Sequence, residues 1–282
     1  MTLRINTNIQ AINTHRNMLG TDMRLSSSLE KLSSGLRINH ASDDAAGLSI
    51  ADRLLTQVNG LNVAQANAQQ GITLFNVADG ALDQIGSILQ RVRELAVQSS
   101  NGTLTTSDRV AADAEVQSLL SEVDNIASFT TFNGFSLLNN GATTGAATTF
   151  TFQVGSQQNQ TVVATIAGTC TGQLKLGIAP ANTIDVSTQA HAQAALTSLD
   201  FAINQINVIR GGIGAASNRL QYEINNIGVS AQNLKAAESQ IRDVDFASEM
   251  STLTQNQILM QSATAMLAQA NAQPQSVLSL FR

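Results

Sequence analysis

The sequence predicts a mainly α-helical protein, in which long antiparallel helices form a terminal coiled coil and a helical rod domain, with a small β-hairpin insert. Three observations support this fold class. Apolar residues recur at helical spacing along most of the chain, both prolines (Pro180 and Pro274) fall outside those stretches, and aromatic residues make up only 4% of the sequence. Proline is the strongest helix breaker, and few aromatics leave little volume for a thick globular core. The chain is therefore suited to long helix–helix seams.

The last long stretch, Ala237 to Gln273, contains no proline or glycine. Apolar residues recur in it every seven positions, at Phe246, Leu253, Met260 and Leu267. This spacing places a narrow apolar seam along one side of a helix, which needs a partner helix to cover it. Pro274 is expected to end this helix.

The partner is predicted at the other end of the chain. An apolar stripe there consists of Ile5, Ile9, Ile12, Leu19 and Met23, and it continues after a shift through leucines to Leu36. Each seam is too thin to stabilise an isolated helix. The two ends of the chain are therefore expected to pair as a coiled coil.

Between these ends the pattern predicts two long helices, a third helix and a short insert. The Ser42–Asp44 cluster is suited to cap a helix that runs to about Ser100, and a third helix, capped near Ser107, runs to about Ser128. Asn-Gly turns and the alternating segment 150–154 then indicate β-structure, with weaker strand candidates at 161–166 and 173–178. Helix resumes near Ser187 and leads into the terminal helix.

This layout predicts two domains. Residues 1–42 and 238–282 are expected to form a discontinuous coiled-coil domain. Residues 43–237 are expected to form the rod domain, with the β or loop insert at about 129–186.

Composition argues against several functions. Fifteen basic and twenty acidic side chains give a net charge of −5 without basic runs, which argues against binding a nucleic-acid backbone. The single cysteine, Cys170, excludes an internal disulfide framework, and a small buried hydrophobe is favoured over a free thiol or a crosslinking site. Neither a secretory signal nor a membrane-spanning run is recognisable, and by these tests alone the protein would be cytosolic.

No catalytic, cofactor or metal site is predicted. His15, His40 and His191 lie far apart in the sequence and none has a second ligand at metal spacing. The segment 211–214, Gly-Gly-Ile-Gly, interrupts a helical pattern rather than following a strand, so a closely packed helix turn is favoured over a phosphate loop.

One surface cluster is of a different kind. Val92 and Ala96 belong to the apolar stripe of the second helix, which leaves Arg91 and Leu95 four residues apart on a ridge expected to face outward. By pattern alone, a solvated helix face is favoured over a binding patch.

The chain resembles bacterial flagellin. The N-terminal motifs are LRINTNIQAINTHRN, LEKLSSGLRINHASDDAAGLSIADRL, LQRVRELAVQSSNGT and FNGFSLL. The C-terminal motif is QNLKAAESQIRDVDFASEMSTLTQNQILMQSATAMLAQANAQPQSVLSLFR. The resemblance covers about residues 1–138 and 190–282.

The resemblance implies a structural, non-enzymatic subunit. It is expected to leave the cell through the flagellar type III channel without a cleaved signal peptide and to polymerise outside the cell into the helical filament that serves motility. This displaces the cytosolic prediction. The implied partners are other copies of the chain, an export chaperone, the filament cap and the hook-junction proteins, with neither nucleic acid nor membrane.

The resemblance also assigns roles to two sets of residues. The terminal stripes become the polymerisation seam, formed by Ile5, Ile9, Ile12, Leu19, Met23, Phe246, Leu253, Met260 and Leu267. In flagellins that Toll-like receptor 5 senses, the recognition stretch corresponds to Gln90, Arg91, Leu95 and Glu115, and the same surface contacts neighbouring subunits in the filament.

Three departures limit the resemblance. The variable middle is short, Cys170 is unusual for a family poor in cysteine, and Phe246 stands where tyrosine is expected. The alternative within the flagellum is the hook–filament junction protein, which shares the helical ends. An enzyme inserted in the middle segment is disfavoured, since that segment lacks both room and ligands.

Overall fold

The computed structural model describes residues 7–139, 147–171 and 184–280, with side chains as far as Gln273. Its helices are α1 (Ile9–Ser34), α2 (Ala45–Ser99), α3 (Thr106–Phe129), α4 (Gln189–Arg242) and α5 (Phe246–Leu280). Its strands are β1 (Thr131–Phe132), β2 (Phe135–Ser136), β3 (Ala147–Gln153) and β4 (Thr161–Ala167). The predicted mainly α-helical fold is confirmed. Ile5, the turn at Asn140-Gly141 and the strand candidate at 173–178 lie outside the described residues.

The chain divides into two compact units. Unit 1 consists of residues 1–57 and 232–282, and unit 2 consists of residues 58–231. Helices α2 and α4 each contribute to both. Residues 43–57 and 232–237, which the sequence assigned to the rod, therefore lie in the unit that holds both termini.

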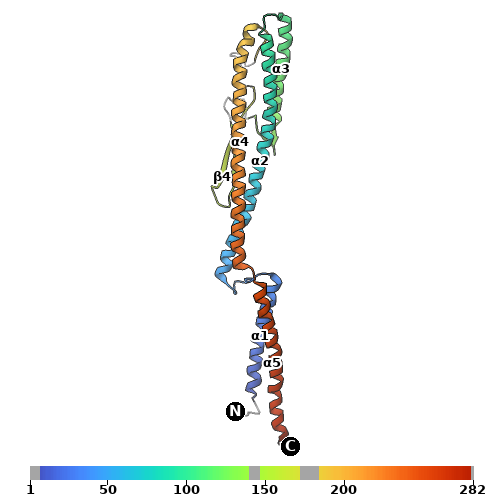
Figure 1. Cartoon of the computed structure of the whole chain (residues 1–282), viewed down its shortest axis with the longest axis vertical. Helices are drawn as coiled ribbons and strands as arrows, with labels where there is room; N and C mark the ends of the chain where they lie inside the picture. The colour runs from blue at the N-terminus through green and yellow to red at the C-terminus, as the bar shows by residue number, and fades with distance from the viewer. Residues whose placement is uncertain (1–6, 140–146, 172–183, 281–282) are drawn as a thin grey trace. The chain divides into compact units, whose positions relative to one another are not determined.

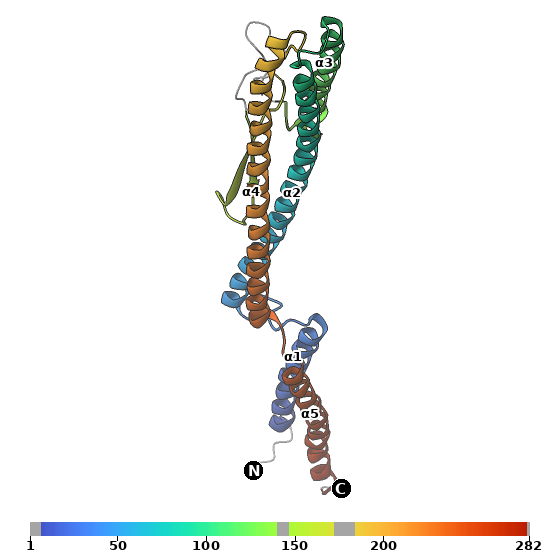
Figure 2. The same cartoon turned by 45° about the horizontal axis from the view of Figure 1, so that its top comes forward.

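In unit 1, α1 lies alongside α5 (Figure 2). The side chain of Asn8 begins α1, because its Oδ1 accepts a hydrogen bond from the Ala11 amide at 3.1 Å, and its Nδ2 donates to the Ala270 carbonyl of α5 at 2.7 Å. Gly35 ends α1 with a left-handed φ of 73°, and its amide donates to the Lys31 carbonyl. The Asn8 side chain thus both caps α1 and links α1 to α5.

The start of α2 is fixed by Asp44. Its carboxylate accepts a hydrogen bond from the Gly47 amide at 2.9 Å, as expected for a helix N-cap. A Cβ at Gly47 would collide with that carboxylate and would lie 2.8 Å from Cδ1 of Ile38. Glycine is therefore required for this cap to pack closely.

The predicted terminal helix differs from the structure at both ends. Residues 243–245 interrupt it, because the Asp243–Val244 backbone pairs with the segment after α1: the Val244 amide donates to the Gly35 carbonyl at 3.0 Å. Asp245 then caps α5 by accepting from the Ala247 amide at 3.0 Å. At the other end α5 continues past Pro274 to Leu280, since a proline removes one helical hydrogen bond but keeps a helical φ.

Unit 2 is built on α2, α3 and α4, which run side by side (Figure 1). Their core is continuous from Ala64 to Ile227, and Leu82, Ile85 and Leu89 in its middle are inaccessible to solvent. Ion pairs also join α2 to α4. Arg93 Nε lies 2.7 Å from Asp200 Oδ1, and Arg210 bridges Asp79 and Asp83 at 2.8 Å each.

The β-structure packs on this helical core. Strands β1 and β2 form a hairpin whose turn, Asn133-Gly134, has positive φ at both residues, 51° and 81°, as an Asn-Gly hairpin turn requires. Strands β3 and β4 pair antiparallel, with Phe152 opposite Val162. The ring of Phe152 meets Phe75 of α2 edge to face at 5.6 Å. The strands predicted at 150–154 and 161–166 are thus present, and β3 begins three residues earlier.

Candidate interaction surfaces

The described residues hold no cluster of three or more histidine, cysteine, aspartate or glutamate side chains that could bind a metal ion. Two histidines are instead in isolated pairs with carboxylates. His40 Nε2 lies 2.7 Å from Glu30 Oε1, and His191 Nδ1 lies 2.6 Å from Asp185 Oδ2. Both histidine side chains are more than half exposed. Neither pair is part of a built catalytic arrangement.

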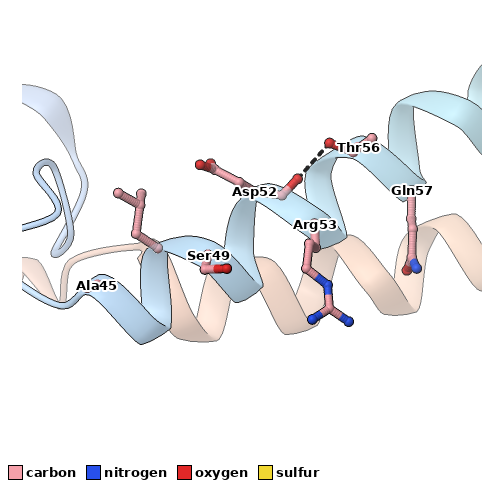
Figure 3. A pocket seen from close by; sticks show the side chains of 7 residues that line it. Ala45, Ser49, Asp52, Arg53, Thr56 and Gln57 are labelled. Atoms are coloured by element: carbon pink, nitrogen blue, oxygen red, sulfur yellow. Dashed lines mark hydrogen bonds between the residues drawn. The ribbon is translucent and has the colours of Figure 1, made fainter.

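The hollow nearest the start of α2 is open and lined by a single helix face. It has a volume of about 640 Å³, and its lining residues run from Ala45 to Gln57. Figure 3 shows that they come from successive turns of α2, where Thr56 Oγ1 donates to the Asp52 carbonyl at 2.8 Å. A single helix face with no opposing wall is poorly suited to enclose a small ligand.

Helix α5 presents a regular heptad seam to α1. From Glu249 to Gln273 its only buried or half-buried side chains are Glu249, Leu253, Asn256, Met260, Ala263, Leu267 and Ala270. Their alternating spacing of four and three residues is that of a coiled coil. The predicted positions Leu253, Met260 and Leu267 all lie on this face, whereas Phe246 is 56% exposed. Their role in polymerisation stays a prediction.

The seam of α1 is not the one predicted from its large apolar residues. Ile9, Ile12, Leu19 and Met23 are all exposed, Met23 to 71%. The buried or half-buried positions at heptad spacing are Ala11, Thr14, Met18, Thr21, Leu25, Ser28 and Leu32, and Gly20, Ser27 and Lys31 beside them are half-buried as well. The prediction that the apolar stripe faces the C-terminal helix is therefore wrong for Ile9 to Met23 in the single chain, whereas Leu25 and Leu32 of its predicted continuation do lie in the seam.

The missed seam was recognisable only by its spacing. It alternates three and four residues as regularly as the seam of α5, but every second position carries a hydroxyl: Thr14, Thr21 and Ser28. A search for hydrophobic residues skips such positions. Small side chains allow two helices to approach closely, and the hydroxyls can bond within the helix, as Thr21 Oγ1 does to the Asn17 carbonyl at 3.0 Å.

Both terminal helices consequently keep a second apolar face. On α5 it includes Met250, Ile258, Leu259 and Met266, all exposed. The exposed stripe of α1 is its counterpart. Contiguous exposed apolar surface of this kind is characteristic of interaction sites.

The structure brings together three of the four residues of the predicted recognition patch. Arg91 Nη2 and Nε on α2 donate to Glu115 Oε1 on α3, at 3.0 and 3.2 Å. Arg91 Nη1 also donates to Glu94 Oε2 at 3.2 Å. The hydrogen bond to Glu115, with a smaller contribution from Glu94, raises the pKa of the Arg91 guanidinium. Gln90 is exposed beside it.

Leu95 is different, and its predicted exposure is wrong. It is only 3% exposed and belongs to the core, together with Val92 and Ala96. The prediction assumed one apolar stripe on α2. Because α2 packs against both α3 and α4, a wider arc of its surface is covered. Leu95 therefore belongs to the core rather than to the surface that carries Arg91 and Glu115.

Cys170 is half-buried against the core of unit 2. Burial raises the pKa of its thiol, and the nearby Asp124 carboxylate raises it further. That carboxylate is held by Thr171, whose amide and hydroxyl donate to it at 2.8 and 2.9 Å. A thiol with a raised pKa is a weak nucleophile at neutral pH, so a packing role is favoured.

Within the described part of the chain, none of the helices combines the length and the apolar character needed to cross a membrane.

The sequence matches two parts of one protein family. Residues 5–143 match the bacterial flagellin N-terminal helical region, and residues 196–281 match the bacterial flagellin C-terminal helical region. These two matches leave out the segment that contains β3 and β4.

Similar proteins extend the match to nearly the whole chain. The flagellar filament 33 kDa core protein of Treponema phagedenis is 44% identical, over 99% of each chain. The flagellin of Bacillus subtilis is 43% identical, over 99% of this chain and 100% of its own. A putative flagellar hook-associated protein from Vibrio parahaemolyticus shares the fold, with a TM-score of 0.58 at 17% identity, over 71% of this chain and 100% of its own.

Proposed function

The chain belongs to the bacterial flagellin family, whose members are structural subunits of the flagellar filament, and we propose on this premise how it assembles. The apolar faces of α1 and α5 that remain exposed in the single chain pack against other copies and form the inner wall of a helical tube. Unit 2 surrounds that wall as the rod domain. The flagellin family is a structural family and not a family of enzymes.

The observation that carries this proposal is the double-sided character of the terminal helices. Ile9, Ile12, Leu19 and Met23 would lose contact with water only in an assembly. At about 25 cal/mol per Å² of apolar surface, burying a side chain of this size contributes roughly 1.5–3 kcal/mol. The burial of several such residues in each copy therefore strongly favours polymerisation.

The assembly proposal is tested with purified protein. A precipitating salt should convert monomers to long tubes visible by electron microscopy, because such salts strengthen apolar burial. Ile12→Asp and Leu19→Asp should prevent tube formation, since each places a charge in an apolar contact. Asn13→Asp, at an exposed position beside Ile12, is the matched control and should assemble. Amorphous precipitate from the unchanged protein would contradict the proposal.

We further infer that the subunit is exported through the flagellar type III channel and functions outside the cell. The thin α1–α5 seam supports this, because a pair held by few large apolar contacts opens at little cost. An export chaperone would cover the apolar faces before export, and the filament cap and hook-junction proteins would meet the same faces at the two ends of the polymer. Retention of the subunit in cells that lack the export channel tests the route.

The hook–filament junction protein is the less favoured alternative. The family matches at both ends name flagellin, and the full-length relatives are filament proteins. We expect a junction protein, unlike a filament subunit, not to form long tubes alone. Long tubes from purified protein therefore also separate the two.

For recognition by Toll-like receptor 5, we propose that the accessible part of the patch is Gln90, Arg91 and Glu115. The pairing of Arg91 with Glu115 across α2 and α3 supports one continuous surface. Arg91→Ala should reduce receptor signalling by monomers, whereas Arg93→Ala, two positions further along the same helix, is the control. Intact filaments should signal less than monomers, because neighbouring subunits would cover the patch.

A further inference from the structure

Every methionine of this chain falls within residues 1–57 or 232–282, which make up unit 1. The methionines are Met1, Met18, Met23, Met250, Met260 and Met266. Unit 2, residues 58–231, contains none, and its core consists mainly of leucine, isoleucine, valine and alanine. The thioether side chains are therefore confined to the unit whose helices are proposed to assemble.

Three of these methionines are exposed in the single chain, and we call Met23, Met250 and Met266 the outer methionines. Met23 is 71% exposed, Met250 50% and Met266 61%. Met18 and Met260, by contrast, occupy half-buried positions of the α1–α5 seam. A reagent dissolved in water therefore reaches the outer methionines more easily than the two in the seam.

The outer methionines belong to the apolar faces that the chain leaves uncovered. Met23 follows the seam residue Thr21 by two positions, about 200° around the helix at 3.6 residues per turn, so it lies on the side away from α5. It comes four residues after the exposed Leu19, and Met266 comes seven residues after the exposed Leu259. At these spacings each shares a helix face with a leucine. Other copies are proposed to pack on these same faces.

A thioether differs from the neighbouring leucines because a peroxide can oxidise it. The sulfur lone pair attacks one peroxide oxygen, so that an S–O bond forms and the O–O bond breaks, and the other oxygen leaves as water or an alcohol. The sulfur is oxidised and the peroxide is reduced. The product, methionine sulfoxide, is polar and disrupts the apolar contacts that methionine makes.

We propose that the outer methionines are oxidation sites through which a peroxide blocks assembly of this chain. The proposal rests on the proposed function, because a sulfoxide opposes the packing of these faces against other copies: burying its S–O group without a hydrogen-bond donor is unfavourable. Oxidation proceeds in the monomer and is slow once other copies cover the side chains. The block is reversible, because methionine sulfoxide reductases restore the thioether. They release the oxygen as water while two thiols are oxidised to a disulfide.

The rest of the chain offers a peroxide little else to oxidise. It has no tryptophan, and Cys170 is its only other sulfur-containing residue. Burial raises the pKa of the Cys170 thiol, which leaves less of the reactive thiolate. Unit 2 is therefore an internal control, because methionine oxidation cannot change a residue of its core.

The first arm of the test compares monomers and tubes of the Cys170→Ser chain, in which methionine supplies the only sulfur. Both are treated with dilute hydrogen peroxide, and the gain of one oxygen at each methionine is followed by peptide mass spectrometry. In monomers we expect the outer methionines to react several-fold faster than Met18 and Met260, in line with their exposure. In tubes we expect the outer methionines to react several-fold more slowly than in monomers.

The second arm measures assembly. We expect oxidised monomers to need about tenfold or more protein to form tubes, because polar groups have replaced apolar ones at the contact. Treatment with methionine sulfoxide reductases A and B, which together reduce both sulfoxide epimers, should restore the original concentration. The unfolding temperature of unit 2, followed by circular dichroism, should be the same before and after peroxide.

Two matched variants identify the responsible sites. The outer variant combines Met23→Leu, Met250→Leu and Met266→Leu, which keep an apolar side chain of similar volume and remove the sulfur. It should form tubes equally well with and without peroxide treatment. The seam variant combines Met18→Leu and Met260→Leu and should remain as sensitive to peroxide as the Cys170→Ser chain.

The outcomes separate this inference from the proposed function. Oxidised monomers that form tubes at the original concentration would overturn the inference and leave the filament function standing. The same holds if peroxide still blocks assembly of the outer variant, if it lowers the unfolding temperature of unit 2, or if the outer methionines react equally fast in tubes and monomers. Failure of the untreated chain to form tubes would overturn the proposed function and this inference together.

Discussion

The α1–α5 pair of unit 1 and the three-helix core of unit 2 differ in how much of the apolar surface of each helix they cover. In unit 1, each helix turns one narrow seam inward, and hydroxyl or amide side chains such as Thr21, Ser28 and Asn256 occupy seam positions. In unit 2, a broad apolar arc of α2 is enclosed by two other helices, and residues such as Leu82 and Leu89 lose all solvent contact.

This difference indicates which of the two units is stable in the monomer. Two helices bury one stripe each, so large apolar residues outside that stripe remain in water. A third helix covers a wider arc and removes those residues from water. Unit 2 is therefore expected to be stable in the monomer, whereas the terminal pair should become stable only when other copies cover its second apolar faces.

Matched leucine-to-aspartate substitutions should separate the two units most strongly. Leu89→Asp buries an unpaired charge at a position with 0% exposure, which should cost roughly 4–5 kcal/mol or more and unfold unit 2. Thermal unfolding followed by circular dichroism measures this. Gln90→Asp, at the next and exposed position, is the control and should unfold within a few degrees of the unchanged chain.

Leu253→Asp should leave unit 2 folded and abolish assembly. Leu253 is 8% exposed in the α5 seam, and an uncompensated carboxylate there should cost about 3 kcal/mol in the assembled state. Leu267→Asp, at a half-buried seam position, should act in the same direction more weakly. Tubes from Leu253→Asp that are as abundant as those of the unchanged protein would show that this seam is dispensable.

A methyl group added at a glycine should have opposite effects on stability in the two units. A Cβ at Gly71 in unit 2 would lie 2.8 Å from Cδ1 of Leu220 and 3.0 Å from Phe152, so Gly71→Ala should destabilise unit 2 by about 1–3 kcal/mol. A Cβ at Gly20 on α1 has only the Arg24 side chain at 4.0 Å. Gly20→Ala should instead favour the α1 helix by about 1 kcal/mol. Urea unfolding and monomer helix content measure the two effects.

Thr21→Val tests whether hydroxyls keep the α1–α5 seam weak. The substitution keeps the shape of the side chain and replaces a buried hydroxyl that bonds only within its own helix. We expect the terminal pair to gain up to about 1 kcal/mol, and its segments to resist limited proteolysis longer in the monomer. Thr14→Val should act in the same direction, and Thr7→Val, before the helix, should have no effect. Faster proteolysis of Thr21→Val would contradict this account.

The smallest expected effect concerns pH at the start of α4 in unit 2. Burial opposes ionisation of Asp185, but hydrogen bonds from Ser187 and His191 outweigh it, so the pKa of Asp185 is lowered in the folded chain. A lowered folded pKa means that its contribution to stability is complete above the ordinary value of 3.8 and is lost as the pH falls through the lower folded value. Asp185→Asn should reduce this acid sensitivity, with an effect of a few tenths of a kcal/mol at neutral pH. Unfolding temperatures measured from pH 3 to pH 6 check it.

Much of the fold was predictable because the conformation that each cap, turn or strand residue favours locally is the one it adopts in the folded chain. Asp44 at the start of α2, Asn133-Gly134 in its hairpin turn and the alternating residues of β3 act through their own backbone neighbours. The cap of the third helix was predicted near Ser107, two residues late, since the cap is Thr105, which forms a capping box with Asp108 in which each side chain bonds the backbone amide of the other. Such local features require no knowledge of the rest of the chain.

The prediction of the candidate surfaces depended on which face of each helix is covered, and there it was less successful. Leu95 and Arg91 are equally plausible surface residues by spacing, yet one is core and the other is exposed. The apolar stripe of α1 was identified from its residues, but in the structure Ile9, Ile12, Leu19 and Met23 are exposed. On α4, Val208, Tyr222 and Val229 share the heptad spacing of a core face and are also exposed.

The sequence by itself determined the helical periods, the caps and turns that divide them, and the flagellin motifs at both ends, because these depend on residues within a few positions of each other or on direct similarity. Only the tertiary structure decided that Thr21 rather than Leu19 faces α5, that Leu95 belongs to the core while Arg91 is exposed, and that residues 243–245 break the last helix. The physical reason is that a helix with two apolar faces does not specify which one its own chain will cover. That choice depends on how many helices pack around it and on how closely their small side chains let them approach.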